Sequence, residues 1–411
     1  MLNIWFISKY GACPPKYTKG GRSRLFYLAQ EMRKIGNQVI LITSDSNHFS
    51  NFPKTKKTYN NDTEDDVPFK WIRTIKYKKT VSILRVLSWL DFELKLFLMP
   101  LKSMVKPDVV IISSLSIFSI VYGNYLKKKF NCFLVFEIRD IWPLAMTEEG
   151  GFSKNHPLVR FIGMIEKFGY KKADLIVGTF PKLDMHVKNI LGYDRPFFCS
   201  PQGFDPEKYN TDEEIDTSMF QNYVHKDRVI IGYAGSIGIS NSLQLFIDTI
   251  KLMKDDSDIY FLIVGSGDLK HKYEEELAGY HNVVFLHRIE QDKVKCFLSI
   301  CDIVYLSTND SKFWKFGQSL NKIVEYMLAG KPIIATYTGY PSMINEANCG
   351  VFVPSKNPED LRDVFISYAH FSKKERENIG KKGRDWIYQH RTYEMLAKDY
   401  LQKINSMIVK N

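Results

Sequence analysis

The chain has 411 residues, of which 45% are hydrophobic and 14% aromatic, with 24 glycines and 16 prolines. This composition excludes a disordered, collagen-like or disulfide-scaffold protein. The length predicts two or three domains, each with its own core. Lysine and arginine number 57 against 46 aspartate and glutamate, so the formal net charge is +11. A basic balance favours an anionic partner, such as nucleic acid, anionic lipid or a phosphorylated small molecule.

The basic excess is confined to the first half of the chain. Residues 1–200 contain 31 basic and 17 acidic side chains, a net charge of +14, whereas residues 201–411 contain 26 and 29, a net charge of −3. The two halves are therefore expected to meet different partners. Alternatively, the lysines only solvate helix faces, as surface lysines commonly do.

Short apolar runs recur along the chain, each followed by a loop and a helical pattern, which predicts βα units and parallel sheets. The runs cover residues 2–7, 39–43, 109–112, 133–136 and 175–177, and then 229–234, 260–264, 283–286, 303–306, 332–335 and 351–353. Residues 50–70 are expected to form a polar excursion or mobile loop. Proline and glycine cluster at 199–206. The sequence thus predicts two doubly wound α/β domains that face across a cleft.

Residues 81–105 combine many leucines with Trp89 and three cations, and Pro100 interrupts the pattern. The segment is too charged to span a bilayer. It fits either a helix on an anionic membrane surface or a buried helix that covers the sheet. The six cysteines show no CxxC or metal-ligand spacing, and no secretory signal is expected at the N-terminus. A reducing, cytoplasmic location is expected.

A glycine pair follows the first predicted strand. Gly20 and Gly21 are flanked by Arg22 and Arg24 and precede a predicted helix. Glycines let a backbone approach a phosphate closely, and a helix N-terminus adds amide donors and a positive dipole. The alternative is a plain turn between a strand and a helix.

In the second half, Gly265 again lies between a predicted strand and a helix. Further on, Lys322 and Glu325 are three residues apart and share one face of a predicted helix. The cation is suited to bind a diphosphate, and the carboxylate is suited to accept hydrogen bonds from a pair of ribose hydroxyls.

These motifs resemble those of the retaining glycosyltransferases of GT-B fold. The resemblance rests on Tyr233-Ala234-Gly235-Ser236, Val264-Gly265-Ser266-Gly267, Asn282 to Leu286, Lys322 to Pro332, Gly20-Gly21 with Arg24, Glu137 to Pro143 and Pro201 to Asp205. The bacterial surface-polysaccharide transferases related to the N-acetyl-L-fucosamine transferase of O-antigen assembly are the most similar subgroup. The resemblance implies an acceptor-binding domain at 1–200, a nucleotide-sugar domain at 201–390, and a C-terminal helix at 391–411 that packs back on the first domain.

The resemblance also implies roles for individual residues. The implied donor-binding residues are Gly20, Gly21, Ser236, Gly265, Arg288, Ser319, Leu320 and Glu325, the catalytic ones are Asp140, Lys322 and Arg139, and the acceptor-binding ones are Arg22, Arg24, Glu137 and Trp142. Glu137 is alternatively a buried partner of Arg139. Asp140 alternatively caps the segment that follows it.

Three positions depart from the family pattern. Gly317 stands where many members carry a glutamate, and Ser236 and Asn241 stand where many carry an arginine and a lysine. We expect Lys322 to supply the missing diphosphate charge. In addition, Arg139 replaces the histidine of the wider family, so no catalytic base is assigned.

The implied activity is retaining transfer of a sugar from a nucleotide donor, expected to be a UDP-sugar, to a polyprenyl-diphosphate-linked saccharide. The expected place is the inner face of an anionic membrane, in O-antigen or capsule synthesis. The acidic triplet Asp256-Ser257-Asp258 could suggest a metal-diphosphate site, but it precedes a strand and so lies at the edge opposite the one where ligands bind. No metal cofactor is therefore expected. A UDP-sugar 2-epimerase and a non-catalytic nucleotide- or nucleic-acid-binding protein are the alternatives, although no basic and aromatic nucleic-acid motif supports the last.

Overall fold

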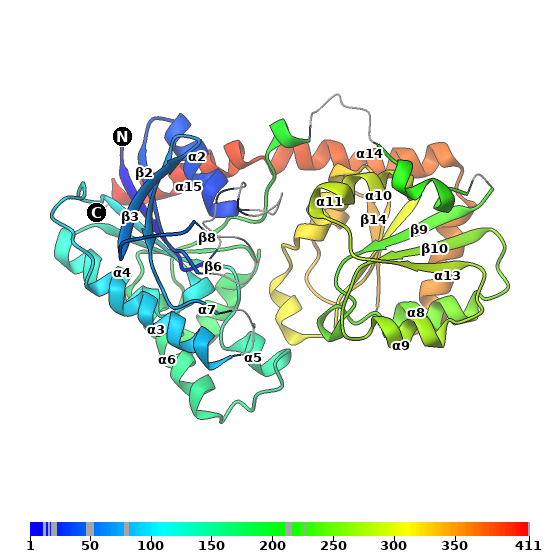
Figure 1. Cartoon of the computed structure of the whole chain (residues 1–411), viewed down its shortest axis with the longest axis horizontal. Helices are drawn as coiled ribbons and strands as arrows, with labels where there is room; N and C mark the ends of the chain where they lie inside the picture. Colours follow the sequence, from blue (N-terminus) through cyan, green and yellow to red (C-terminus); the bar gives the residue numbers. More distant parts are fainter. Residues whose placement is uncertain are drawn as a thin grey trace. The chain divides into compact units, whose positions relative to one another are not determined.

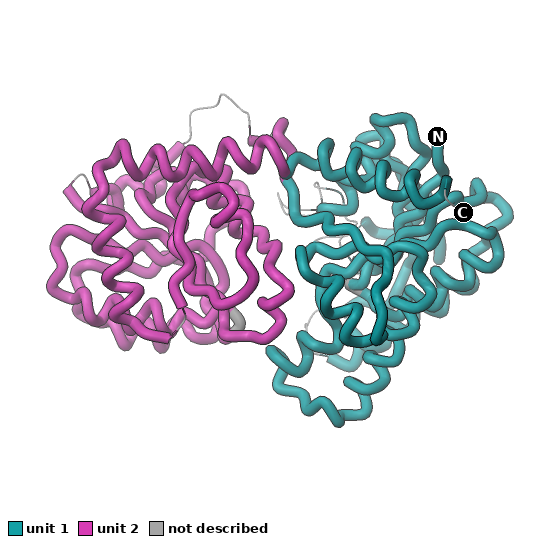
Figure 2. Tube along the Cα trace, turned by 180° about the vertical axis from the view of Figure 1, so that it is seen from behind, with its two compact units in different colours: residues 1–203, 391–411 teal, residues 204–390 magenta. Residues whose placement is uncertain are grey.

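The computed structural model describes residues 1–411 except 11–13, 15–16, 18–22, 47–52, 78–81, 210–215, 226, 355 and 410–411. It divides into two compact units, shown in Figure 2. Unit 1 contains residues 1–203 and 391–411, and unit 2 contains residues 204–390. In each unit, helices cover both faces of a sheet (Figure 1). The two α/β domains expected from the sequence are therefore confirmed.

Unit 1 is built on an eight-stranded sheet with the order β3-β4-β2-β1-β5-β6-β7-β8. Its strands are β1 (Asn3–Ile7), β2 (Gln38–Ser44), β3 (Tyr59–Glu64), β4 (Val67–Ile72), β5 (Val109–Ser113), β6 (Phe133–Ile138), β7 (Leu175–Gly178) and β8 (Phe197–Cys199). Its helices are α2 (Arg24–Lys34), α3 (Ile83–Phe97), α4 (Ser119–Phe130), α5 (Leu144–Glu148), α6 (Pro157–Lys172), α7 (Leu183–Leu191) and α15 (Tyr393–Ile408). Every pairing is parallel except that of β3 with β4.

The C-terminal helix α15 completes the core of unit 1. It packs against α2, and the rings of Tyr27 and Tyr393 stack with their centroids 5.0 Å apart. Its buried residues join Ile4, Phe6 and other inward residues of the sheet in one apolar cluster. Residues far apart in sequence thus cover one face of the same sheet.

Unit 2 is built on a six-stranded parallel sheet with the order β11-β10-β9-β12-β13-β14. Its strands are β9 (Val229–Ala234), β10 (Ile259–Val264), β11 (Val283–Leu286), β12 (Ile303–Ser307), β13 (Ile333–Thr336) and β14 (Gly350–Val353). Its helices are α8 (Gln244–Leu252), α9 (Lys270–Glu276), α10 (Val294–Ile300), α11 (Asn321–Leu328), α12 (Met343–Glu346), α13 (Pro358–His370) and α14 (Lys373–His390). Separate apolar clusters lie on the two faces of this sheet, as parallel strands buried on both sides require.

The expectation of a loop over residues 50–70 is wrong for residues 59–70. β3 and β4 form an antiparallel hairpin in which Tyr59 pairs with Ile72 and Glu64 with Val67. Asp65 and Asp66 make its two-residue turn at φ values of 43° and 61°, which is the geometry of the tightest hairpins. β3 is polar because it is the edge strand, so its sequence lacks the apolar alternation that marks a strand.

Candidate donor site in unit 2

The candidate site lies where β9, β10 and β11 end at one edge of the unit 2 sheet. Their last residues are in register, because Ala234 pairs with Val264 and Val264 with Leu286. Ligands of open α/β sheets bind at this carboxyl edge. The loops that leave the three strands therefore form the floor of the site.

The loops after β9 and β10 are hydrogen-bonded to each other. The Gly235 amide donates to the Val264 carbonyl at 2.9 Å, and the Ile237 amide to the Ser266 carbonyl at 2.9 Å. A side chain at position 265 would collide with the Gly235 carbonyl oxygen. Gly265 is buried, whereas Ser236 and Ser266 are exposed. Glycine at 265 thus lets two backbone loops touch and present their polar groups at the surface.

Lys322 reaches this pair of loops from the first turn of α11. Its Nζ donates to Tyr233 Oη at 2.9 Å and to Asn241 Oδ1 at 2.8 Å, and it lies 4.6 Å from the centre of the Tyr233 ring. A Cβ at Gly235 would collide with the same ammonium group. Burial lowers the pKa of Lys322 to about 8.

The Lys322 ammonium therefore lies close to positions 236 and 241, where many members of the family carry a cation and this chain does not. It contacts Asn241 directly, and it lies against Gly235, the neighbour of Ser236. Tyr233, which belongs to the motif at 233–236 but is given no role by the sequence, positions it and in turn donates to the Ser236 carbonyl at 2.8 Å. A buried tyrosine at the end of a strand gives no sequence signal beyond that of a core residue.

The start of α11 adds backbone donors beside Lys322. Leu320 is the N-cap residue, and no side chain caps this helix. Its first amides therefore point toward the site together with the positive end of the helix dipole. Gly317, three residues before the cap, has a φ of 93°, a conformation that a glutamate adopts only with strain. This explains why a glycine stands at that position.

Glu325 lies one turn further along α11 and accepts a hydrogen bond from Gln291 Nε2. Gln291 belongs to the segment that follows β11, three residues after the exposed Arg288. This hydrogen bond links Glu325, which is expected to bind a ribose, to the loop after β11, which is expected to face a nucleobase. Gln291 is a second residue that the sequence did not indicate, because its partner is distant in the chain.

The carboxyl edge of unit 1 holds the remaining candidates. Arg139 and Asp140 follow β6 directly; Asp140 is exposed, Arg139 half-buried, and Trp142 also half-buried. The Arg139 amide donates to Ser114 Oγ at 3.0 Å. Gly20, Gly21 and Arg22 lie outside the described residues.

Arg24 and Glu137 have different surroundings from those expected of acceptor contacts. Both are buried, and Arg24 Nη2 lies 3.6 Å from Glu137 Oε2. The Arg24 guanidinium also donates to Ser200 Oγ at 2.7 Å, to the Ser200 carbonyl at 2.8 Å and to the Pro201 carbonyl. We therefore revise the expected role of both residues: they hold the chain where it leaves unit 1.

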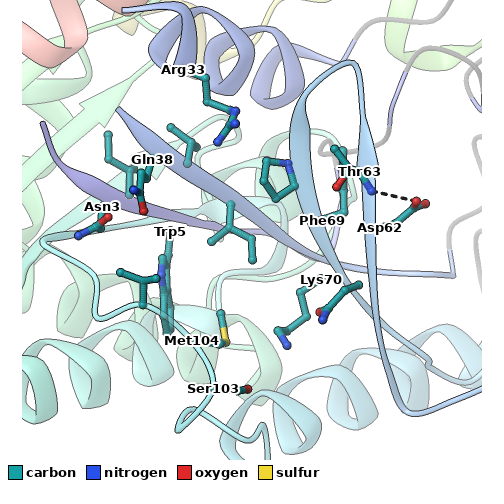
Figure 3. Close-up of a pocket in the computed structure, with 16 residues that line it drawn as sticks. Asn3, Trp5, Arg33, Gln38, Asp62, Thr63, Phe69, Lys70, Ser103 and Met104 are labelled. Atoms are coloured by element: carbon teal, nitrogen blue, oxygen red, sulfur yellow. Dashed lines mark hydrogen bonds between the residues drawn. The ribbon is translucent and has the colours of Figure 1, made fainter. Parts of the chain in front are cut away.

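A cavity in unit 1 and an acidic turn in unit 2 lie away from the carboxyl edges of the two sheets. Figure 3 shows a cavity of about 680 Å³ in unit 1 that is lined by Asn3 and Gln38, the first residues of β1 and β2, and by the nearly buried Lys70. It opens at the amino edge of the sheet, opposite to the edge where ligands of such sheets bind. In unit 2, the Asp256 carboxylate accepts the amides of Asp258 and Ile259 and caps a turn at the amino edge.

Among the described residues, no three His, Cys, Asp or Glu side chains gather as a metal site requires. A metal-free reaction stays a prediction.

Comparison with known proteins finds a family match within unit 2. Residues 228–369 match the family described as glycosyl transferases group 1. No curated protein matches the chain significantly in sequence. The fold resembles the sucrose-phosphate synthase of Thermosynechococcus elongatus, with a TM-score of 0.71, 15% identity and 100% of both chains covered.

Two further solved structures have the same fold. Anabaena HepE in complex with UDP and glucose has a TM-score of 0.66 at 14% identity, covering 99% of this chain and 100% of the other. WaaG, a glycosyltransferase involved in lipopolysaccharide biosynthesis, has a TM-score of 0.64 at 16% identity, covering 96% and 98%. Unit 2 thus carries a segment that matches the glycosyl transferases group 1, and the whole chain has the GT-B fold of these proteins; together the two findings support a glycosyltransferase enzyme.

Proposed function

We propose that the protein transfers a sugar from a UDP-sugar to a polyprenyl-diphosphate-linked saccharide, with retention of anomeric configuration. The transfer belongs to the assembly of a surface polysaccharide at the inner face of an anionic membrane. The observation that carries the donor part is the Lys322 ammonium at the start of α11, which contacts Tyr233 and Asn241 and lies against Gly235.

The donor diphosphate binds at this point because two sources of positive potential converge there. Lys322 supplies a full charge, and the start of α11 supplies amides and its dipole. Gly235 and Gly265 let the two adjoining backbone loops lie against each other beside them. Glu325 accepts the ribose hydroxyls, and the loop at 287–290 lies against the base. UDP and glucose bound to HepE, which has the same fold, support a UDP-sugar as the donor.

Transfer proceeds on one face of the sugar. The bond from the anomeric carbon to the diphosphate oxygen breaks, and the bond to the acceptor oxygen forms on the same face. The acceptor proton passes to the departing diphosphate oxygen, so no strong protein base is needed. The protein contributes fixed positive groups that stabilise the charge that develops on the diphosphate. Asp140, exposed at the end of β6, orients the acceptor hydroxyl.

The proposed acceptor rests on the uneven distribution of charge between the two units. Unit 1 carries 35 lysines and arginines against 19 acidic residues, and unit 2 carries 22 against 27. A basic unit 1 favours an anionic acceptor, such as a lipid diphosphate at an anionic membrane. WaaG has the same fold and is involved in lipopolysaccharide biosynthesis, which is consistent with an acceptor of this class.

Donor binding is tested by thermal shift with UDP, GDP, ADP and CMP, since a ligand of the folded state raises its stability. We expect UDP to stabilise the protein and Lys322→Gln and Glu325→Ala to abolish that effect. Lys382→Gln, an exposed lysine of the same unit, is the matched control. No stabilisation by UDP, or unchanged binding in both variants, would reject the proposal. Conversion of a UDP-sugar to its 2-epimer without any acceptor would identify the epimerase instead.

A further inference from the structure

Helix α3 buries a narrow side that contains Ser88, Phe92 and Leu96, and it exposes a wide apolar face on the other side. The outer face comprises Ile83, Leu84, Val86, Leu87, Leu90, Leu94, Phe97 and Leu98, all exposed. Ile83 is 80% exposed and Leu94 60%, whereas Ser88 is fully buried. The alternative of a buried helix thus holds only for this inner side, because most apolar side chains of α3 are exposed. An apolar stripe of this length on one helix marks an interaction surface.

The inner side of α3 explains why the helix is oriented this way. Lys9, fully buried, donates from Nζ to Ser88 Oγ at 2.9 Å. Glu93 Oε1 accepts from Ser116 Oγ at 2.8 Å and from Ser119 Oγ at 2.6 Å. These polar contacts, together with the buried Phe92 and Leu96, fix the rotation of the helix about its axis and hold the outer face outward.

Cations lie near the C-terminal end of the outer face. Lys102 and Lys106 are exposed just beyond the helix. Lys129 lies 5.4 Å from the centre of the Tyr125 ring, which itself lies 5.8 Å from Phe97. Asp91 is on the same helix, but its charge is paired with Lys95 at 2.8 Å.

We propose that the outer face of α3 docks on an anionic lipid bilayer, with its leucines among the acyl chains and the surrounding lysines at the headgroups. A second copy of the chain fits less well, because its identical lysines would face these across the interface. None of the described helices combines the length and apolar character needed to cross a bilayer.

Docking by α3 places the carboxyl edge of the unit 1 sheet beside the membrane. Lys9 and Tyr10 follow β1, and Tyr10 Oη accepts from Trp89 Nε1 of the helix. Ser116 follows β5. Since a helix with its side chains is about 10–12 Å across, the edge lies roughly that far from the lipid headgroups. This inference deepens the proposed function and rests on it for the lipid-linked acceptor that would enter there.

The test is co-sedimentation of the full chain with vesicles of equal parts phosphatidylglycerol and phosphatidylcholine, and with phosphatidylcholine alone. We expect binding to the anionic vesicles that weakens with added salt. Leu90→Glu with Leu94→Glu should weaken it roughly tenfold or more, and so should Lys102→Glu with Lys106→Glu. The matched control is Met219→Glu with Leu252→Glu, two exposed apolar residues of unit 2, which should bind as the wild type does.

Stabilisation by UDP separates this inference from the proposed function. All these variants should still be stabilised by UDP, because every substituted residue is exposed and lies outside the donor site. Stabilisation by UDP also verifies that each variant is folded. A wild-type chain that UDP stabilises but that ignores anionic vesicles would overturn docking and leave the donor assignment intact. Vesicle binding without any stabilisation by UDP would support docking and overturn the donor assignment. A dimer in solution that Leu90→Glu with Leu94→Glu dissociates, without vesicle binding, would show that a second copy covers the face.

Discussion

Lys322 makes donor binding depend on pH. With a pKa of about 8 in the free protein, its side chain is about 90% protonated at pH 7 and about 10% at pH 9. A bound diphosphate favours the protonated form, so affinity falls as pH rises through 8. We expect UDP to bind about tenfold more weakly at pH 9 than at pH 7 by calorimetric titration. Lys322→Arg should flatten this dependence, and an equally steep profile in that variant would assign it to another group.

Arg24 and Glu137 form a buried pair in which each charge requires the other. Arg24→Met leaves the Glu137 carboxylate buried without its cation, which costs about 3–5 kcal/mol of the free energy of unfolding. Arg24→Met with Glu137→Met should recover much of this loss, because an apolar pair of similar volume replaces both charges. Urea unfolding of unit 1 measures both, with Lys34→Met as the exposed control. A double variant no more stable than Arg24→Met would show that the bonds to Ser200 and Pro201 dominate.

At the level of elements, α15 contributes to stability far from any site. Ile404 is fully buried in the apolar cluster of unit 1. Ile404→Ala should therefore lower the free energy of unfolding of unit 1 by about 2–5 kcal/mol. Met395→Ala, on an exposed position of the same helix, should change it by less than about 0.5 kcal/mol. Equal effects of the two would mean that α15 is only loosely packed.

The elements also show what a sequence can predict. Buried parallel strands such as β1, β9 and β10 are continuous apolar runs, and their pattern alone predicts them correctly. The β3–β4 hairpin escapes prediction because its edge strand is polar and Pro68 interrupts its partner. Spacing predicts the glycine loops and Lys322. It does not predict that Tyr233 contacts Lys322 or that Gln291 contacts Glu325, because those contacts join residues that are distant in sequence.

For the whole molecule, two separate cores predict two unfolding transitions. The apolar cluster of unit 1 shares no residue with those of unit 2. A 100-fold excess of UDP over its dissociation constant should stabilise unit 2 by about 2.7 kcal/mol and leave unit 1 unchanged. Scanning calorimetry with and without UDP tests this, and Ile404→Ala identifies the transition of unit 1. A single transition that shifts as a whole would show that the units unfold together.

The division of unit 1 into two sequence segments has a consequence for biosynthesis. Residues 1–203 leave the ribosome first, but α15, which covers one face of their sheet, is made only after residues 204–390. At about 5–20 residues per second this takes roughly 10–40 s. During that interval the sheet and α2 expose the apolar surface that later receives Tyr393, Leu396 and Tyr400. Nascent unit 1 therefore exposes this apolar surface until α15 has emerged, whereas unit 2 can close its core as soon as α14 has emerged.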